Sequence, residues 1–128
     1  LGSVPALAAE LGAASAERDL ARDLPFFAFG RIRELGIGTL RVPRRFGGPG
    51  ASIAELIEAV TVLASGEPNV AHSLRSHFNY TETLFLAADG PEVRRSARLL
   101  LDGALFGGAH TEIGTPRPGD VTTTVVST

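Results

Sequence analysis

Residues 105–112, Leu-Phe-Gly-Gly-Ala-His-Thr-Glu, divide the chain into a long helix-forming part and a short β-branched part. The small residues at positions 107–109 leave backbone amides open to close approach by a flat or anionic ligand. The three residues that follow them supply polar side chains. Composition alone leaves two interpretations open, a cofactor-binding loop or an ordinary glycine-rich connection between a helix and a strand.

Five helices are predicted before this stretch, from apolar periodicity and from residues typical of helix ends. Proline in the first turn and glycine after the last turn mark several of their boundaries. The predicted helices run from about Pro5 to Leu20, from Pro25 with Asp23 as N-cap to Gly36, from Ser52 to Gly66, from Pro68 to about Ala88, and from Pro91 to Gly103.

The third predicted helix has the clearest start, because Ser52 and Glu55 have the spacing of a capping box. Leu7, Leu11 and Ala14 fit one face of the first predicted helix, and each later helix has an apolar face that we expect to be buried. These faces consist of Phe26, Phe29 and Ile32; Ile53, Leu56, Ile57, Val60 and Ala64; Val70, Leu74, Phe78, Thr81 and Phe85; and Val93, Ala97, Leu100 and Leu101.

After residues 105–112 the chain changes from helix-forming to β-branched composition. A turn is predicted at 116–120, and residues 121–128 are almost all β-branched, which predicts a strand. A lone strand is not stable, so we expect the sheet that receives it to lie outside this sequence. The resulting fold class is all-α, with a helical domain over residues 1–105 and the start of a truncated β-domain over 106–128. The short β-tolerant run Thr39–Val42 is followed by a glycine-rich loop.

Composition narrows the function classes. The 128 residues carry a net charge of -2 with no cluster of basic residues, so we expect no nucleic-acid partner. No apolar run is long enough for a membrane span, and the absence of cysteine suits a cytoplasmic protein. The chain begins at Leu1 and contains no methionine, from which we expect a fragment or a trimmed chain.

Candidate chemistry centres on one histidine. His72 and His77 are five residues apart on a helix and do not share a face, so we expect no metal site. The carboxylates are scattered, and neither a nucleophile elbow nor a dinucleotide fingerprint is present. His77 lies near Phe78 and Tyr80, which together could bound a pocket for an aromatic or flavin-like group. The alternative is a partly buried histidine whose hydrogen bonds are satisfied inside the fold.

The order of these motifs resembles the N-terminal helical domain of acyl-CoA dehydrogenases. The resemblance covers nearly the whole chain and rests on the run 35–52, on the small-residue helix after it, and on Phe106 to Glu112. It implies that the helical domain precedes a β-domain and a four-helix bundle. It also implies that the segment ending in Thr111 and Glu112 lines a flavin, FMN or FAD.

Within that superfamily, positions 69–72, Ser76 and His77, followed by 106–112, look most like the flavin-dependent monooxygenase branch of the dibenzothiophene monooxygenase type. The resemblance implies that His77 is a catalytic residue that stabilises a flavin hydroperoxide. It assigns flavin contacts to Gly108, Ala109, His110 and Thr111, and substrate contacts to Phe78 and Tyr80. A hydrogen-bond donor beside a peroxide could stabilise the charge that develops on the departing oxygen.

The function expected from this resemblance is that of a reduced-flavin-dependent monooxygenase acting on a small sulfur-containing or aromatic substrate. A flavin reductase would be a partner, and the enzyme would be a homo-oligomer, a tetramer. Two alternatives stay open, an acyl-CoA dehydrogenase and a non-catalytic helical module. Gly108 stands where the monooxygenase branch usually has Asn, and Ile113 stands where the dehydrogenases usually have Pro.

Overall fold

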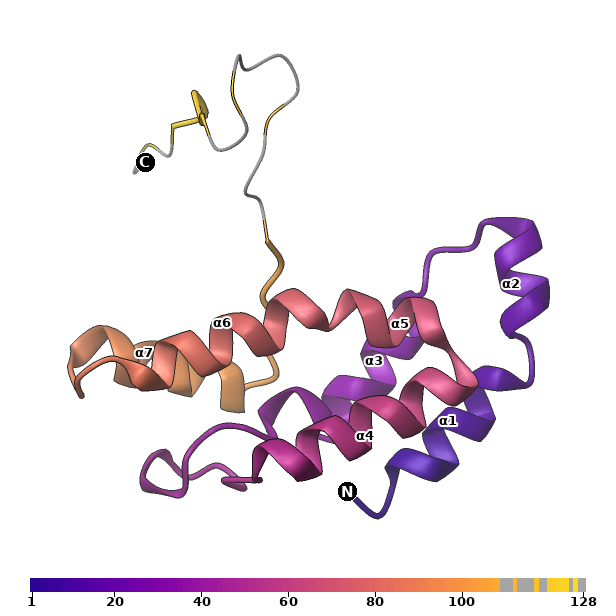
Figure 1. Cartoon of the computed structure of the whole chain (residues 1–128), viewed down its shortest axis with the longest axis horizontal. Coiled ribbons are helices and arrows are strands. Elements are labelled where there is room, and N and C mark those ends of the chain that lie inside the picture. Colours follow the sequence, from indigo (N-terminus) through magenta and orange to yellow (C-terminus); the bar gives the residue numbers. More distant parts are fainter. Residues whose placement is uncertain (109–111, 113–116, 118–119, 125, 127–128) are drawn as a thin grey trace.

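Helices form nearly all of the regular structure (Figure 1). The computed structural model describes residues 1–108, 112, 117, 120–124 and 126. Within these residues the all-α class is confirmed. The elements are α1 (Val4–Gly12), α2 (Ser15–Ala21), α3 (Phe26–Glu34), the 3-10 turns η1 (Ile37–Thr39) and η2 (Arg44–Phe46), α4 (Ile53–Gly66), α5 (Pro68–Ser73), α6 (Arg75–Leu86) and α7 (Pro91–Leu101).

The closest helix packing in the domain is between α1 and α4, which lie side by side. Two glycines permit it. A Cβ atom on Gly66 would lie 2.0 Å from the Ala8 carbonyl oxygen, and one on Gly12 would lie 3.3 Å from the Gly66 Cα. Gly66 has no room for a larger residue and Gly12 has little, so the backbones of α1 and α4 pack closely around Leu7, Leu11 and Leu63, which are at most 1% exposed.

The first predicted helix is in fact two helices, and the single span from Pro5 to Leu20 was wrong. α1 ends at Gly12, and Ala14 leaves the helical conformation with φ -128° and ψ 20°. The Arg18 guanidinium donates a hydrogen bond to the Leu11 carbonyl, one of the groups that a helix end leaves unpaired. α2 therefore turns away from α1 and has no buried residue of its own.

The start of the second predicted helix also differs. Pro25, not Asp23, occupies the N-cap position of α3, and it offers no side-chain cap. The helix turns Ala28 and Ile32 toward the core, which leaves Phe26 76% exposed and Phe29 only partly buried. The prediction of a buried Phe26 was therefore wrong, because the close packing of α3 uses its smaller residues.

The third predicted helix is confirmed as α4, with its capping box. The Glu55 N–H donates to the Ser52 hydroxyl at 3.2 Å, and the Ser52 N–H donates to the Glu55 carboxylate at 2.7 Å. Its buried face is shifted from the predicted one, since α4 presents Ala59 to the core between Leu56 and Leu63. Ile53 and Ile57 are 50% and 58% exposed, which contradicts their predicted burial.

The fourth predicted helix is interrupted at Leu74 and forms α5 and α6. Its predicted stripe is otherwise confirmed from Val70 to Thr81, with Phe85 partly buried. The fifth is confirmed as α7, with Val93, Ala97 and Leu100 buried, whereas Leu101 is 37% exposed. The run Thr39–Val42 forms the end of η1 and the turn after it instead of a strand, and the Val42 N–H donates to the Thr39 carbonyl at 2.9 Å.

The last segment leaves the helical domain beside α6 (Figure 1). Residues 121–124 and 126 form no strand, and the rest of the predicted strand and most of the turn at 116–120 lie outside the described residues. The described residues form no strand with which 121–124 could pair, and pairing is what makes a strand stable.

The contact between α1 and α4 leads to a first prediction. Gly66→Ala places a methyl group against the Ala8 carbonyl, so we expect the free energy of unfolding to fall by about 2 to 3 kcal/mol. Chemical denaturation followed by circular dichroism measures this loss.

Gly30→Ala is the matched control, because Gly30 lies inside α3 with no atom within 4 Å of the added Cβ. Alanine is the better helix former there, so the same substitution should raise stability by about 0.5 to 1 kcal/mol. Equal effects of the two changes would contradict the close packing at Gly66.

Candidate functional site

His77 lies on the inner side of α6 and is 1% exposed. Its Nε2 is 2.7 Å from the Gly38 carbonyl oxygen, and its Nδ1 is 3.2 Å from the backbone nitrogen of Phe106. The Phe106 N–H can only donate, so Nδ1 is the acceptor and Nε2 carries the proton donated to Gly38. The imidazole thus joins η1, α6 and the start of the stretch 106–112 through one neutral tautomer.

Glycine at position 38 makes this arrangement possible. A Cβ atom there would lie 2.7 Å from a methyl carbon of Leu105 and 3.2 Å from His77 Nε2. Any larger residue would push away either the leucine or the imidazole. Because residue 38 has no side chain, its carbonyl can lie at hydrogen-bond distance from the ring.

Burial sets the charge state of His77. Removal from water lowers the pKa of the imidazole, and the hydrogen bond to the Gly38 carbonyl acts in the opposite direction without overcoming it. The neutral ring is thereby favoured in the folded chain. Both ring nitrogens are used within the protein, so neither is free in this structure to contact a bound cofactor.

Tyr80 holds the same segment from the next turn of α6. Its ring stacks on Phe106 with centroids 4.4 Å apart and an angle of 27° between the planes. The phenol donates to the Ser96 hydroxyl on α7 at 3.3 Å. Phe106 also lies nearly parallel to His77, with centroids 6.4 Å apart. We call His77, Tyr80 and Phe106 the linker root, because the C-terminal segment leaves the helices there.

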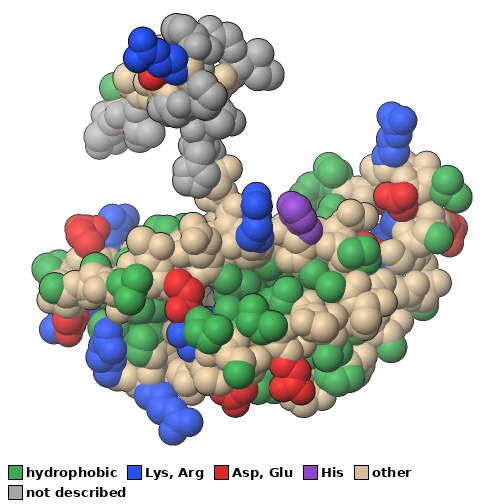
Figure 2. All heavy atoms as spheres, viewed as in Figure 1, with side chains coloured by type: hydrophobic (Ala, Val, Ile, Leu, Met, Phe, Trp, Pro, Cys, Tyr) green, Lys and Arg blue, Asp and Glu red, His purple; other side chains and the backbone are tan. Residues whose placement is uncertain are grey.

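Phe78 is placed differently from the other predicted site residues. It is 6% exposed, belongs to the core, and contacts the edge of His77 at 5.1 Å between centroids. Its other side lines a groove of about 440 Å³ between α4 and the pair α5 and α6, where Figure 2 shows hydrophobic side chains gathered. The structure therefore brings Tyr80 to the linker root and Phe78 to the wall between that root and the groove.

The predicted flavin contacts lie at the edge of what the structure describes. Gly108 is exposed, and Ala109, His110 and Thr111 lie outside the described residues. Glu112 is described, and its carboxylate accepts hydrogen bonds from the Thr122 N–H, the Thr122 hydroxyl and the Thr123 N–H. The hydrogen bonds from Thr122 and Thr123 lower its pKa to about 2.

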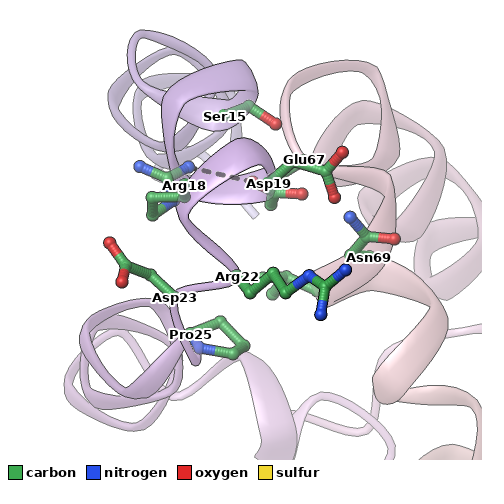
Figure 3. A pocket seen from close by; sticks show the side chains of 9 residues that line it. Ser15, Arg18, Asp19, Arg22, Asp23, Pro25, Glu67 and Asn69 are labelled. Atoms are coloured by element: carbon green, nitrogen blue, oxygen red, sulfur yellow. Dashed lines mark hydrogen bonds and ion pairs between the residues drawn. The ribbon is translucent and has the colours of Figure 1, made fainter.

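A second polar site, which the sequence did not reveal, lies where α2 meets the junction of α4 and α5 (Figure 3). Glu67 sits between these two helices and is 4% exposed. Its Oε2 accepts a hydrogen bond of 2.9 Å from Arg18, which ties α2 to the rest of the domain. Its Oε1 is buried with no hydrogen-bond partner among the described residues.

Glu67 stays charged although it is buried. Desolvation acts to raise the pKa of this carboxyl, but Arg18, with Ser15 and the Asn69 backbone nearby, outweighs it and lowers the pKa. The carboxylate lines a pocket of about 310 Å³ together with Ser15, Arg18, Asp19, Arg22, Asp23, Pro25, Asn69 and Val70. Nothing in the sequence marks Glu67, because a glutamate between a glycine and a proline normally indicates an exposed connection.

The described residues contain no group of three or more metal-ligating side chains. None of their helices is both long enough and apolar enough to cross a membrane. Comparisons of the chain with protein-family models, with curated proteins and with solved structures found no match.

The contacts of His77 lead to the second prediction. His77→Leu leaves the Gly38 carbonyl and the Phe106 N–H without partners in a buried place, so stability at pH 7 should fall by about 2 to 4 kcal/mol. His72→Leu removes an exposed imidazole from α5 and should change stability little. Urea denaturation of both variants measures the difference, and an equal effect would contradict the buried role of His77.

The pH dependence of stability provides the third prediction. The folded chain has a lowered pKa at His77, so below the ordinary histidine value of 6.5 the unfolded chain binds more protons than the folded one. The neutral His77 ring should therefore contribute fully to the stability of the wild type above pH 6.5. This contribution to stability should be lost progressively as the pH falls below that value. His77→Leu should lack this loss between pH 6.5 and 5, and retention of the full wild-type slope would contradict the assignment.

Proposed function

We propose that the chain is the N-terminal helical part of a flavin-dependent oxidoreductase, specifically a reduced-flavin-dependent monooxygenase that acts on a small sulfur-containing or aromatic substrate. The observation that supports this most is the linker root. His77 and Tyr80 fix Phe106 at the surface of α6, so that the glycine stretch begins at a defined point of the domain.

The residues that follow the linker root suit a flat ligand. A Cβ on Gly107 would have no atom within 4 Å, and Gly108 is exposed. Among the described residues, no group accepts a hydrogen bond from either of their N–H groups. Open backbone donors beside stacked aromatic rings fit the edge and the face of a flavin, whose ring carries several hydrogen-bond acceptors.

Under this proposal the chain's own groups bind and orient. Gly108 to Thr111 would hold the flavin ring, and Tyr80 with Phe78 would bound the side on which the substrate lies. When bound in its reduced form, the flavin supplies the two electrons needed to insert one oxygen atom of dioxygen into the substrate. The helical wall around His77 excludes water, since the imidazole and Thr81 are almost fully buried.

His77 would act first as a positioning residue. Its neutral ring holds the Phe106 backbone through Nδ1, and this orients the segment that would contact the flavin. A catalytic role for its Nε2–H stays a prediction, and it requires the hydrogen bond to the Gly38 carbonyl to open. Cytoplasmic location, a tetrameric assembly and a flavin reductase as partner belong to the same proposal.

Flavin binding is the test and the fourth prediction. The complete gene product should bind FMN or FAD in a fluorescence titration, and it should consume oxygen with NADH-reduced flavin and a sulfur-containing or aromatic substrate. Tyr80→Ala removes the stack on Phe106, worth about 1 kcal/mol, so flavin binding should weaken about fivefold. Tyr80→Phe keeps the stack and should bind as tightly as the wild type.

The other functions give different results in the same assays. No flavin affinity would overturn the proposal and favour a non-catalytic helical module. Rapid oxidation of an acyl-CoA with an artificial electron acceptor, without monooxygenation, would favour a dehydrogenase.

A further inference from the structure

We propose that the pocket between α2 and the junction of α4 and α5 binds a small zwitterion that carries both an ammonium and a carboxylate group, such as an amino acid. The pocket has a volume of about 310 Å³, at the lower end of the usual range for ligand sites. It lies at the α2 end of the domain, whereas two of the three residues of the linker root belong to α6 (Figure 1). The proposal is independent of flavin binding.

Glu67 supplies the first recognition element. Its side chain is 6% exposed, and its Oε1 lacks a hydrogen-bond partner while Oε2 is held by Arg18. A buried carboxylate oxygen without a donor is costly, so the site is completed by a group that donates a hydrogen bond. Hydrogen bonding from the Ser15 hydroxyl and the Asn69 N–H also lowers the pKa of this carboxyl, but neither group satisfies Oε1.

Arg22 supplies the second element. It is the only described residue other than glycine with a positive φ, 56°, at the C-cap of α2, a position that glycine usually occupies. Its N–H donates to the carbonyls of Arg18 and Asp19, and this fixes the left-handed conformation. Its exposed guanidinium extends across the pocket (Figure 3) and makes no side-chain hydrogen bond with any described residue. A carboxylate is the natural partner for that group.

Figure 3 shows how these elements face each other. Asp19 and Glu67 lie on one side of the pocket, and the Arg22 side chain extends across it toward Asn69. A ligand between them meets carboxylate acceptors at one end and, at the other, the Arg22 guanidinium and the Asn69 amide. The arrangement selects a molecule with a donor and an acceptor close together.

The charge of the lining decides between an ammonium and a hydroxyl as the donor. The pocket is lined by two arginines, Arg18 and Arg22, and by three carboxylates, Asp19, Asp23 and Glu67. Figure 3 shows the Asp23 side chain turned away from the pocket, whereas Asp19 and Glu67 lie on the same side of it. Two carboxylates on that side favour an ammonium group next to Glu67, and Arg22 then pairs with the carboxylate of the same ligand.

The test is a titration of the ¹⁵N-labelled chain with the standard protein amino acids, followed by backbone amide shifts in NMR spectra. At least one amino acid should shift the amides of Arg22, Glu67 and Asn69 saturably, with a Kd of about 1 mM. For L-alanine the one-group analogues are propionate and ethylammonium, and analogues of this kind should bind at least tenfold more weakly than the amino acid.

Two variants test the two recognition elements. Glu67→Gln replaces the acceptor by a neutral amide of the same shape, and Arg22→Gly removes the guanidinium at a backbone conformation that glycine adopts without strain. Both should lose at least tenfold in affinity. Arg22→Gly should keep the circular dichroism spectrum of the wild type, so it decides the matter even if Glu67→Gln folds poorly.

Arg95→Gln is the control, because it removes an exposed arginine from α7, away from the pocket. It should leave the affinity unchanged. The proposal is overturned if no amino acid gives saturable shifts, if the amine analogue binds as tightly as the amino acid, or if Arg22→Gly binds like the wild type.

Discussion

One buried imidazole connects three parts of the chain that are distant in sequence. His77 donates to the carbonyl of Gly38 and accepts from the N–H of Phe106, 39 and 29 residues away. Both hydrogen bonds require the neutral ring with its proton on Nε2. The helical domain and the segment that leaves it therefore share a constraint, because the position of Phe106 depends on a ring that is fixed from the opposite side by η1.

This constraint fixes the point at which Gly107 and Gly108 leave the helical domain. Open N–H groups alone would make a flexible connection, and the hydrogen bond and the ring stack at Phe106 define where it starts. The domain has a different kind of polar site at its α2 end. There Glu67 is buried for a structural purpose, the attachment of α2 through Arg18, and one oxygen remains without a partner. The two sites use different chemistry and need not share a ligand.

Local sequence signals predicted part of this fold, and the limits have a physical origin. The capping box at Ser52 and the stop near Gly66 depend on neighbouring residues and were predicted correctly. The breaks after Gly12 and at Leu74, and the exposure of Phe26 and Ile57, depend on how helices pack. For the sites, the sequence drew attention to His77 and Tyr80 but could not reveal that both nitrogens of His77 are used. Glu67 gave no local signal, since its burial results from contacts with α2.

The state of the His77 ring tests the central claim most directly. In a ¹⁵N-labelled sample near neutral pH, long-range proton–nitrogen correlation spectra distinguish the two nitrogens of each imidazole. For His77 we expect a protonated Nε2 and a hydrogen-bonded, unprotonated Nδ1, in a neutral ring. A ring protonated on Nδ1, or charged at pH 7, would contradict the arrangement by which His77 holds the start of the C-terminal segment.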